Sequence, residues 1–240
     1  MAKIQCMAKV TEVSVLAEGI VSMWLSAPGV AKSAKPGQFI SLYCDNSDTL
    51  LPRPISLCEV NQKDGLLRIV FRIVGAGTKE FAAKEKDDEI RILGPLGNGF
   101  PLDACEKDKT AVLIGGGIGI PPLLELAKQL PCKTTVVVGY RNADTFLQEE
   151  LEEAAERVVI ASDDGSIGIK GTVLDAMEAE GVTGDCIFSC GPTPMLRGVK
   201  QWLLKNRFRR GFQWKKRWHA VLVPVLPVCV SQRKSTRIQK

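Results

Sequence analysis

The feature that most constrains the fold of this chain is a glycine-rich turn between an apolar run and an amphipathic segment. Residues 111–122 read AVLIGGGIGIPP, and LLELAKQL follows. This pattern is typical of a buried strand whose turn lets a pyrophosphate approach the N–H groups at the start of the next helix. A glycine turn that binds nothing is the alternative that this motif leaves open. The glycines are Gly115, Gly116, Gly117 and Gly119.

Strand-like and helix-like runs alternate from this turn onward. Strand patterns at 111–114, 134–140, 158–161 and 186–190 precede helix patterns at 121–130, 145–157, 172–180 and 194–205. Repeated βα units predict a parallel sheet with helices on both faces, which is a Rossmann-like α/β domain.

The part of the chain before residue 94 has a different rhythm, with short strands separated by Pro-Gly, Asp-Gly and charged turns. Strand patterns occupy 9–16, 20–25, 38–43, 55–60, 66–74 and 89–93. In the run 66–74, apolar residues alternate with Arg68 and Arg72, so we expect the two arginines to face outward. Regular short strands of this kind predict a small antiparallel β-barrel. The rhythm changes after GPLGNGF, so we expect a barrel domain over 1–100 and an α/β domain over 101–206.

Length and composition agree with two domains. A chain of 240 residues can bury two cores. No apolar run is long enough to span a bilayer, and the first ten residues lack the apolar core of a secretory signal, so we expect a cytoplasmic protein without a membrane partner. The cysteines have neither disulfide-framework nor metal-site spacing, which favours reduced thiols. They are Cys6, Cys44, Cys58, Cys105, Cys132, Cys186, Cys190 and Cys229.

The positive charge of the chain is concentrated at its end. The formal net charge is +5, yet the last acidic residue is Asp185, and ten Lys or Arg lie in 207–240. The residues before Arg207 therefore carry five more acidic than basic side chains. Because nucleic-acid binding requires a basic surface, we expect no nucleic-acid partner for the two domains.

Two motifs in the barrel region could hold phosphates. In RPIS, Arg53 stands beside Ser56 at the start of a strand, where Pro54 need not donate to a ladder; an Arg next to a hydroxyl can grip a phosphate. The second motif is VFR followed by GAGT at 75–78, whose glycines and hydroxyl could hold a second phosphate. An exposed turn is the alternative for the first motif. Two phosphate-binding motifs on one barrel indicate a flavin dinucleotide.

The order RPIS, VFRIVGAGT, GPLGNGF, GGGIGIPP and CGPTPM resembles the ferredoxin-reductase flavoprotein family. Within it, RPISLCEV, GPLGNGFPL and CGPTPMLRGVK are most similar to the electron-transfer subunits of NAD-dependent dihydroorotate dehydrogenases. The likeness covers residues 1 to about 206. It implies FAD and NAD as cofactors, and a place for Cys190 near the nicotinamide. The cofactor-binding residues it implies are Arg53, Pro54, Ile55, Ser56, Val70, Phe71, Arg72, Gly77, Thr78, Gly115, Gly116, Gly117, Gly119, Ile120, Pro121, Gly191 and Pro192.

Three points stay open on the residues alone. Cys190 could act chemically or could be a small buried residue. The segment 162–166 follows a strand and could line the nucleotide site or be a solvated loop. Arg141 could hold a 2′-phosphate, whereas Asp144 would suit a free ribose hydroxyl. The resemblance favours NAD over NADP.

The end of the chain departs from the family. Family members carry a Cys-x4-Cys-x2-Cys loop and a fourth cysteine for a [2Fe-2S] cluster, whereas residues 207–240 contain only Cys229. The nucleotides that encode this tail can also be read in a shifted frame, from the third base of each codon into the first two bases of the next. In that frame they can encode MEEKMACGIGACLACVCKSTEKDKHS, which contains the Cys-x4-Cys-x2-Cys motif. Our hypothesis is a one-nucleotide frame change near Phe208 that produced an aberrant basic tail over 207–240.

The resemblance implies an electron-transfer flavoprotein subunit that passes electrons from an FMN-containing catalytic subunit through FAD to NAD in pyrimidine biosynthesis, in a heterotetramer by analogy with the family. Two alternatives remain at this point. One is another ferredoxin:NAD(P) reductase-like or hydrogenase-associated subunit. The other is a nucleotide-binding regulatory module without turnover, or an inactive truncated form.

Overall fold

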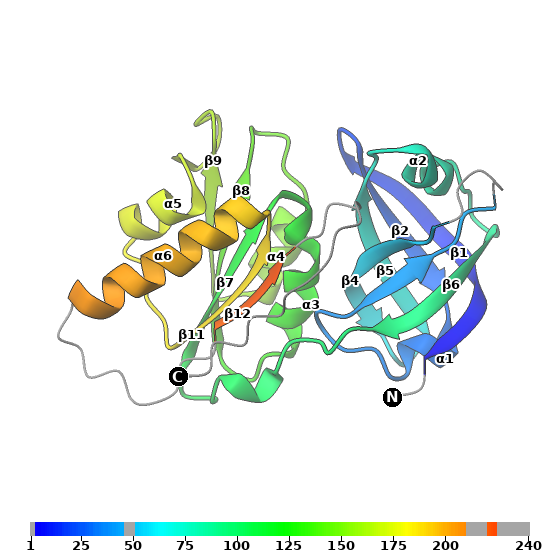
Figure 1. Ribbon diagram of the computed structural model, residues 1–240, viewed down its shortest axis with the longest axis horizontal. Helices are drawn as coiled ribbons and strands as arrows, with labels where there is room; N and C mark the ends of the chain where they lie inside the picture. The colour runs from blue at the N-terminus through cyan, green and yellow to red at the C-terminus, as the bar shows by residue number, and fades with distance from the viewer. Residues whose placement is uncertain (1–2, 46–50, 210–219, 225–240) are drawn as a thin grey trace.

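The computed structural model describes residues 3–45, 51–209 and 220–224. Two bodies are visible in Figure 1, a barrel and a sheet flanked by helices. The barrel is closed in the order β1-β2-β5-β4-β3-β6, and all its pairings are antiparallel. Its strands are β1 (Ile4–Ala17), β2 (Ile20–Ser26), β3 (Phe39–Leu42), β4 (Arg53–Asn61), β5 (Leu66–Arg72) and β6 (Glu89–Leu96).

The second body is a parallel sheet in the order β10-β9-β8-β7-β11-β12. Its strands are β7 (Thr110–Gly116), β8 (Lys133–Tyr140), β9 (Arg157–Ser162), β10 (Ile169–Lys170), β11 (Cys186–Gly191) and β12 (Ala220–Pro224). The predicted fold class, an antiparallel barrel followed by a Rossmann-like α/β domain, is confirmed. The last barrel strand ends at Leu96 and the sheet begins at Thr110, and the division at residue 100 stays a prediction.

Helices cover both faces of the sheet. They are α3 (Pro121–Gln129), α4 (Gln148–Ala154), α5 (Val173–Ala179) and α6 (Thr193–Arg209), and the barrel carries α1 (Pro28–Ala31) and α2 (Ala76–Ala82). Short 3-10 turns, η1 (Leu102–Ala104) and η2 (Gly117–Gly119), flank β7. Side chains of α5 and α6 pack with one face of the sheet. The other face meets α3, which lies between the sheet and the barrel (Figure 1).

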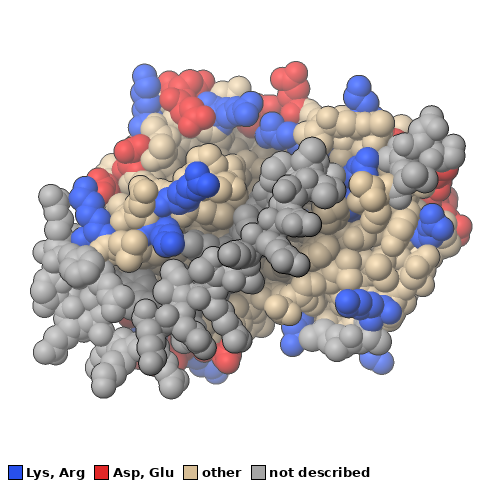
Figure 2. Space-filling view, in the orientation of Figure 1, with Lys and Arg blue, Asp and Glu red and all other residues tan. Residues whose placement is uncertain are grey.

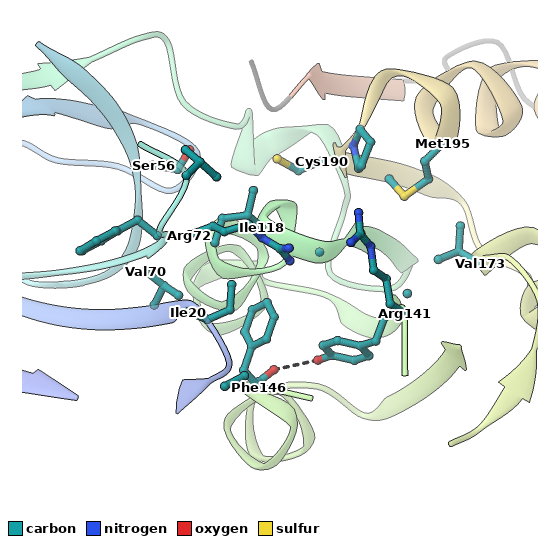
Figure 3. Close-up of a pocket in the computed structure, with 18 of the residues that line it drawn as sticks. Ile20, Ser56, Val70, Arg72, Ile118, Arg141, Phe146, Val173, Cys190 and Met195 are labelled. Carbon is teal, nitrogen blue, oxygen red and sulfur yellow. Dashed lines mark hydrogen bonds between the residues drawn. The ribbon is translucent and has the colours of Figure 1, made fainter. Parts of the chain in front are cut away.

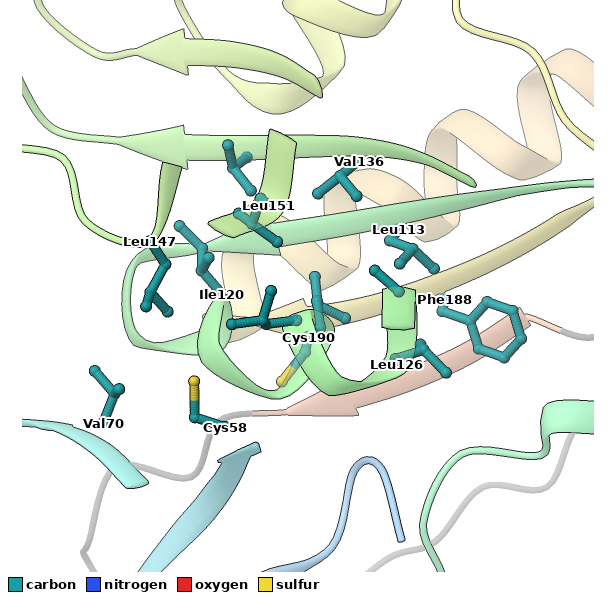
Figure 4. Packing of buried hydrophobic residues seen from close by; sticks show 14 of the residues in the cluster. Cys58, Val70, Leu113, Ile120, Leu126, Val136, Leu147, Leu151, Phe188 and Cys190 are labelled. Carbon is teal, nitrogen blue, oxygen red and sulfur yellow. The ribbon is translucent and has the colours of Figure 1, made fainter. Parts of the chain in front are cut away.

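One apolar cluster runs through this boundary from the sheet into the barrel. It joins Leu113 of β7, Leu126 of α3 and Leu151 of α4 to Cys58 and Val70 of the barrel (Figure 4). Burial of these side chains stabilises the contact between the bodies, because apolar area removed from water contributes about 25 cal/mol per Å2. The two bodies therefore share a core.

Several elements differ from the sequence-based expectation. The helix expected over 145–157 is shorter, because α4 occupies only Gln148–Ala154. Strands β10 and β12 and helix α1 were not predicted. Within the predicted tail over 207–240, α6 ends at Arg209, and β12 pairs in parallel with β11 from Ile187 and Ala220 onward. Most of the tail, at 210–219 and 225–240, lies outside the described residues, and so does the frame-change hypothesis that rests on it.

Candidate nucleotide-cofactor cleft

A cleft of about 1460 Å3 lies between the barrel and the carboxyl edge of the sheet. In Figure 3, Ser56 and Val70 come from the barrel side, Arg141 and Met195 come from the sheet side, and Cys190 lies between them. In the sheet, the chain order reverses between β7 and β11. The carboxyl ends of parallel strands diverge at such a switch point, where open α/β sheets bind ligands.

The barrel wall opens because two neighbouring strands part there. β4 pairs with β5 only from Leu57 and Ile69 onward, whereas residues 53–56 pair with β3 alone. The start of β4 and the end of β5 therefore border the cleft instead of each other. This placement agrees with the expectation that Pro54 stands where a ladder donor is not needed.

Arg53 lies against the first turn of α2. A Cβ added to Gly77 would come within 3.0 Å of Arg53 Nε and 2.9 Å of Cys44 Sγ, so a glycine leaves the room that the guanidinium occupies. Arg53 also donates to the carbonyl of Leu51. Thr78 Oγ1 accepts from the backbone N–H groups of Val74, at 2.9 Å, and Gly75, at 3.1 Å. These contacts hold the guanidinium of Arg53 and the turn before α2 at one end of the cleft.

The glycine turn forms the wall opposite the barrel. Gly116 and Gly117 line the cleft, whereas Gly119 lies behind them against β11. A Cβ on Gly119 would come within 2.3 Å of the carbonyl oxygen of Cys190, so only glycine permits this approach of the two backbones. Pro121 begins α3 without needing an N–H partner. The turn is thereby held against the end of β11.

The predicted cofactor residues divide into two groups. Those that line the cleft are Arg53, Pro54, Ile55, Ser56, Val70, Phe71, Arg72, Thr78, Gly116, Gly117, Cys190 and Pro192. Those outside its lining are Gly77, Gly115, Gly119, Ile120, Pro121 and Gly191, which shape the chain behind it.

Cys190 is a buried thiol beside the cleft. Its side chain is 1% exposed, and burial raises its pKa to about 12. The thiol is therefore neutral near pH 7 and is available for contact, not as a thiolate nucleophile. Its burial agrees with a small buried residue, and a chemical role for Cys190 stays a prediction.

The loop after β8 joins the sheet to the barrel. Asp144 Oδ2 accepts from the backbone N–H of Glu18 at 2.9 Å. Tyr140 donates through its hydroxyl to the carbonyl of Phe146 at 2.7 Å, and the two rings meet edge to face. Burial raises the pKa of Tyr140, so this hydroxyl stays protonated. Asp144 thus bridges the two bodies, and both Asp144 and Arg141 line the cleft.

A buried charge network ties α3 to the barrel below the cleft. Arg68 donates to Glu59 at 2.8 Å and to Ser22 Oγ at 2.9 Å, and Lys128 of α3 pairs with Glu59. Burial disfavours the Glu59 carboxylate, but hydrogen bonds from Lys128 and Arg68 outweigh it and lower its pKa. Arg68 lies on the outer face of β5, opposite the barrel core of Leu67 and Ile69, as predicted, but α3 and α4 cover that face and leave the residue 8% exposed.

Several cleft residues were not singled out from the sequence. Met195 packs where side chains on Gly116 and Gly191 would stand. Ile20, Phe146, Thr172 and Val173 also line the cleft. The cleft residues on the sheet side could have been predicted from their position near the carboxyl ends of the predicted strands, where open α/β sheets bind ligands. Nothing in the local sequence indicated Ile20.

Three further features concern metal ligands, apolar helices and surface charge. Within the described residues, no three His, Cys, Asp or Glu side chains are grouped so that they could hold a metal ion. None of the helices in the described ranges is long and apolar enough to cross a membrane. On the face in Figure 2, basic and acidic side chains of the described residues are interspersed.

Comparison with known proteins agrees with the geometry. Residues 113–201 match the model of the oxidoreductase NAD-binding domain. The dihydroorotate dehydrogenase B (NAD(+)) electron transfer subunit of Geobacillus kaustophilus is 42% identical over 190 residues, which are 78% of this chain and 74% of that protein. This chain belongs to that family. The electron transfer subunit of Listeria innocua is 40% identical over 201 residues, 82% of this chain and 78% of its own.

Solved structures of other proteins share the fold of this chain. The structure of an NADH-dependent reduced ferredoxin-NADP oxidoreductase aligns with a TM-score of 0.74 and 30% identity, covering 84% of this chain and 72% of the other. A ferredoxin NADP+ reductase from Neisseria gonorrhoeae with bound FAD and NADP aligns with a TM-score of 0.73 at 18% identity, covering 91% and 98%. At that identity the second likeness concerns the fold alone.

Proposed function

We propose that this chain is the electron transfer subunit of an NAD-dependent dihydroorotate dehydrogenase and serves pyrimidine synthesis. The observation that carries the proposal is a single cleft with two unlike walls, an opened barrel edge and a glycine turn at a sheet switch point, in a chain of this family. In this assignment FAD occupies the barrel side and NAD the sheet side.

The barrel wall fits a flavin dinucleotide. Arg53 and Thr78 lie where a pyrophosphate would be held by a guanidinium and by a fixed turn. Ile55 and Ser56 offer a strand edge that β5 does not cover, and Val70 offers an apolar surface for a flat ring. The donor types and the size of the cleft suit this group.

The sheet wall fits a nicotinamide dinucleotide. Gly116 and Gly117 allow close approach of a diphosphate to the backbone at the turn before α3. Cys190 and Pro192 would contact the nicotinamide end, with Met195 beside them. Arg141 and Asp163, at the ends of β8 and β9, border the region left for the adenosine end.

FAD, when bound, supplies exchange of an electron pair with the nicotinamide ring and electron exchange with a partner. The residues of the chain orient the two cofactors and exclude water. Apolar side chains such as Ile20, Ile118 and Val173 line the cleft, and with both cofactors bound they would keep water from its centre. The neutral thiol of Cys190 adds no charge there, and the Arg68 network fixes the distance between the walls.

The proposed partner is an FMN-containing catalytic subunit that oxidises dihydroorotate, in a cytoplasmic heterotetramer. A [2Fe-2S] cluster does not fit this chain. Residues 207–240 hold one cysteine, and the described residues offer no group of metal ligands, whereas such clusters take four thiolates.

A reconstituted assay tests the proposal. The chain is combined with FAD, the catalytic subunit, dihydroorotate and NAD+, and NADH formation is followed by absorbance, beside a variant with the alternative reading frame restored after Phe208. We expect both chains to bind FAD and react with NADH, and the frame-restored chain to couple faster to dihydroorotate. A frame-restored chain that binds FAD yet gives no dihydroorotate-dependent NADH would contradict the assigned partner.

A further inference from the structure

Three cysteines converge at the edge of the sheet opposite the cleft. Cys186 begins β11 and pairs with Ala111, while Cys132 directly precedes β8, whose Lys133 pairs with Thr110. Cys132 and Cys186 therefore flank the start of β7. Cys105 directly follows η1 and completes the group. We refer to Cys105, Cys132 and Cys186 as the thiol cluster.

The three side chains belong to one apolar cluster but differ in access to solvent. Cys105 and Cys186 are buried members of the cluster on the α3 face of the sheet, and Cys132 packs against it. Cys186 donates from Sγ to the carbonyl of Ala104 at 3.1 Å, which binds its strand to the η1 turn. Cys105 is 1% exposed and Cys186 is 5% exposed, whereas Cys132 is only half-buried. An accessible thiol thus stands next to a buried one.

We propose that the thiol cluster is a peroxide-sensitive site in which Cys132 and Cys105 form a reversible disulfide. In the first step the Cys132 sulfur attacks the peroxide O–O bond, giving a sulfenic acid and water from hydrogen peroxide. In the second step the Cys105 sulfur attacks the Cys132 sulfur, and the S–O bond breaks. Cys105 loses its proton and the hydroxyl leaves as a second water. The two thiols are oxidised by two electrons, and the peroxide is reduced.

The division of roles follows from burial and from backbone setting. Cys105 and Cys186 are shielded from solvent, whereas Cys132 is only half-buried, so the first reaction with a soluble oxidant falls to Cys132. Cys186 is held by pairing with β7 and by its bond to Ala104. Cys105 lies in a connection between η1 and β7, so its backbone has more freedom to meet Cys132.

The disulfide would enclose the nucleotide-binding unit. The chain between Cys105 and Cys132 contains β7, the glycine turn and α3. A covalent link across such a loop lowers the entropy of the unfolded chain. We therefore expect the oxidised protein to unfold at a higher temperature than the reduced protein, with the shift reversed by dithiothreitol.

Peptide mapping tests this assignment on the full chain. The protein is treated with hydrogen peroxide, free thiols are blocked with iodoacetamide, and digests are compared by mass spectrometry with and without dithiothreitol. We expect one reducible pair, Cys105 linked to Cys132, in the wild type and in a Cys6→Ser control whose altered thiol is also half-buried. A Cys132 linked to any other cysteine, or oxidised without a link, would overturn the proposal.

Two variants separate the steps. Cys132→Ser changes a half-buried side chain, and we expect it to fold, by circular dichroism, and to form no disulfide under peroxide. Cys105→Ala removes the second thiol, and we expect dimedone to label the sulfenic acid at Cys132 more strongly than in the wild type. Equal dimedone labelling of Cys132 in the Cys105→Ala variant and the wild type would contradict the second step. This outcome is independent of FAD, NADH and the partner.

Discussion

At the scale of single residues, Gly77 decides whether Arg53 can occupy its place at the cleft. We expect Gly77→Ala to weaken FAD binding roughly tenfold or more, because its Cβ would displace the guanidinium and overpacking of this kind costs roughly 1–3 kcal/mol. Flavin fluorescence titration measures the change. Gly29→Ala is the matched control, since its Cβ would meet only Ile4 at 3.4 Å. Equal affinities for the two variants would contradict the role of Arg53.

Cys190 illustrates how burial sets the chemistry of a residue. Because its pKa is raised to about 12, the thiol stays protonated across the range of about pH 6 to 9. We expect Cys190→Ala to lower the rate of flavin reduction by NADH less than about tenfold, without changing its pH profile. Stopped-flow absorbance across this range checks the expectation. An inflection present in the wild type and absent in the variant would show that the thiol ionises during turnover.

At the scale of secondary-structure elements, Glu59 and Glu125 lie where α3 meets β4, and their carboxyl groups change the stability of the fold in opposite directions as the pH changes. The hydrogen bonds to Glu59 lower its pKa, so its stabilisation is full above the unfolded value of about 4.5 and is lost as the pH falls. Glu125 accepts from the backbone N–H of Val60 at 3.0 Å, yet its burial raises its pKa. Its contribution is therefore present below about pH 4.5 and lost as the pH rises.

Substitution by glutamine separates the two effects. We expect Glu59→Gln to lower the free energy of unfolding at pH 7 by about 2 kcal/mol, because charge-assisted hydrogen bonds to Arg68 and Lys128 are weakened. Glu125→Gln should raise that free energy at pH 7 and lose its advantage near pH 4. Urea unfolding at both pH values measures the change. A Glu125→Gln variant that is less stable than the wild type at pH 7 would contradict the assignment.

The elements also show where sequence patterns reach their limit. Period-two and βα patterns located the main strands, because alternation along β5 and the run into Gly115 depend on local chain geometry. The burial of Arg68 could not be predicted, since it depends on α3, far along the chain, covering the outer face of the barrel. No local sequence pattern predicted β12 either, because this strand is defined by its pairing with β11.

At the scale of the whole molecule, the site is a product of docking two bodies. Sequence motifs identified residues on both walls, such as Arg53 and Gly116. They did not reveal that Gly119 and Gly191 would lie behind the cleft or that Ile20 would line it. The positions of these residues depend on the shared core and on the hydrogen bond from the Glu18 backbone to Asp144, and neither can be predicted from a local motif.

The central claim is that one cleft holds a flavin and a nicotinamide close enough to react directly. Anaerobic titration of the FAD-loaded chain with NADH, followed by flavin absorbance, tests it without any partner. We expect the flavin absorbance to bleach in proportion to added NADH, with completion near one equivalent. A chain that binds FAD but keeps its absorbance in excess NADH, or that binds no FAD, would contradict the account.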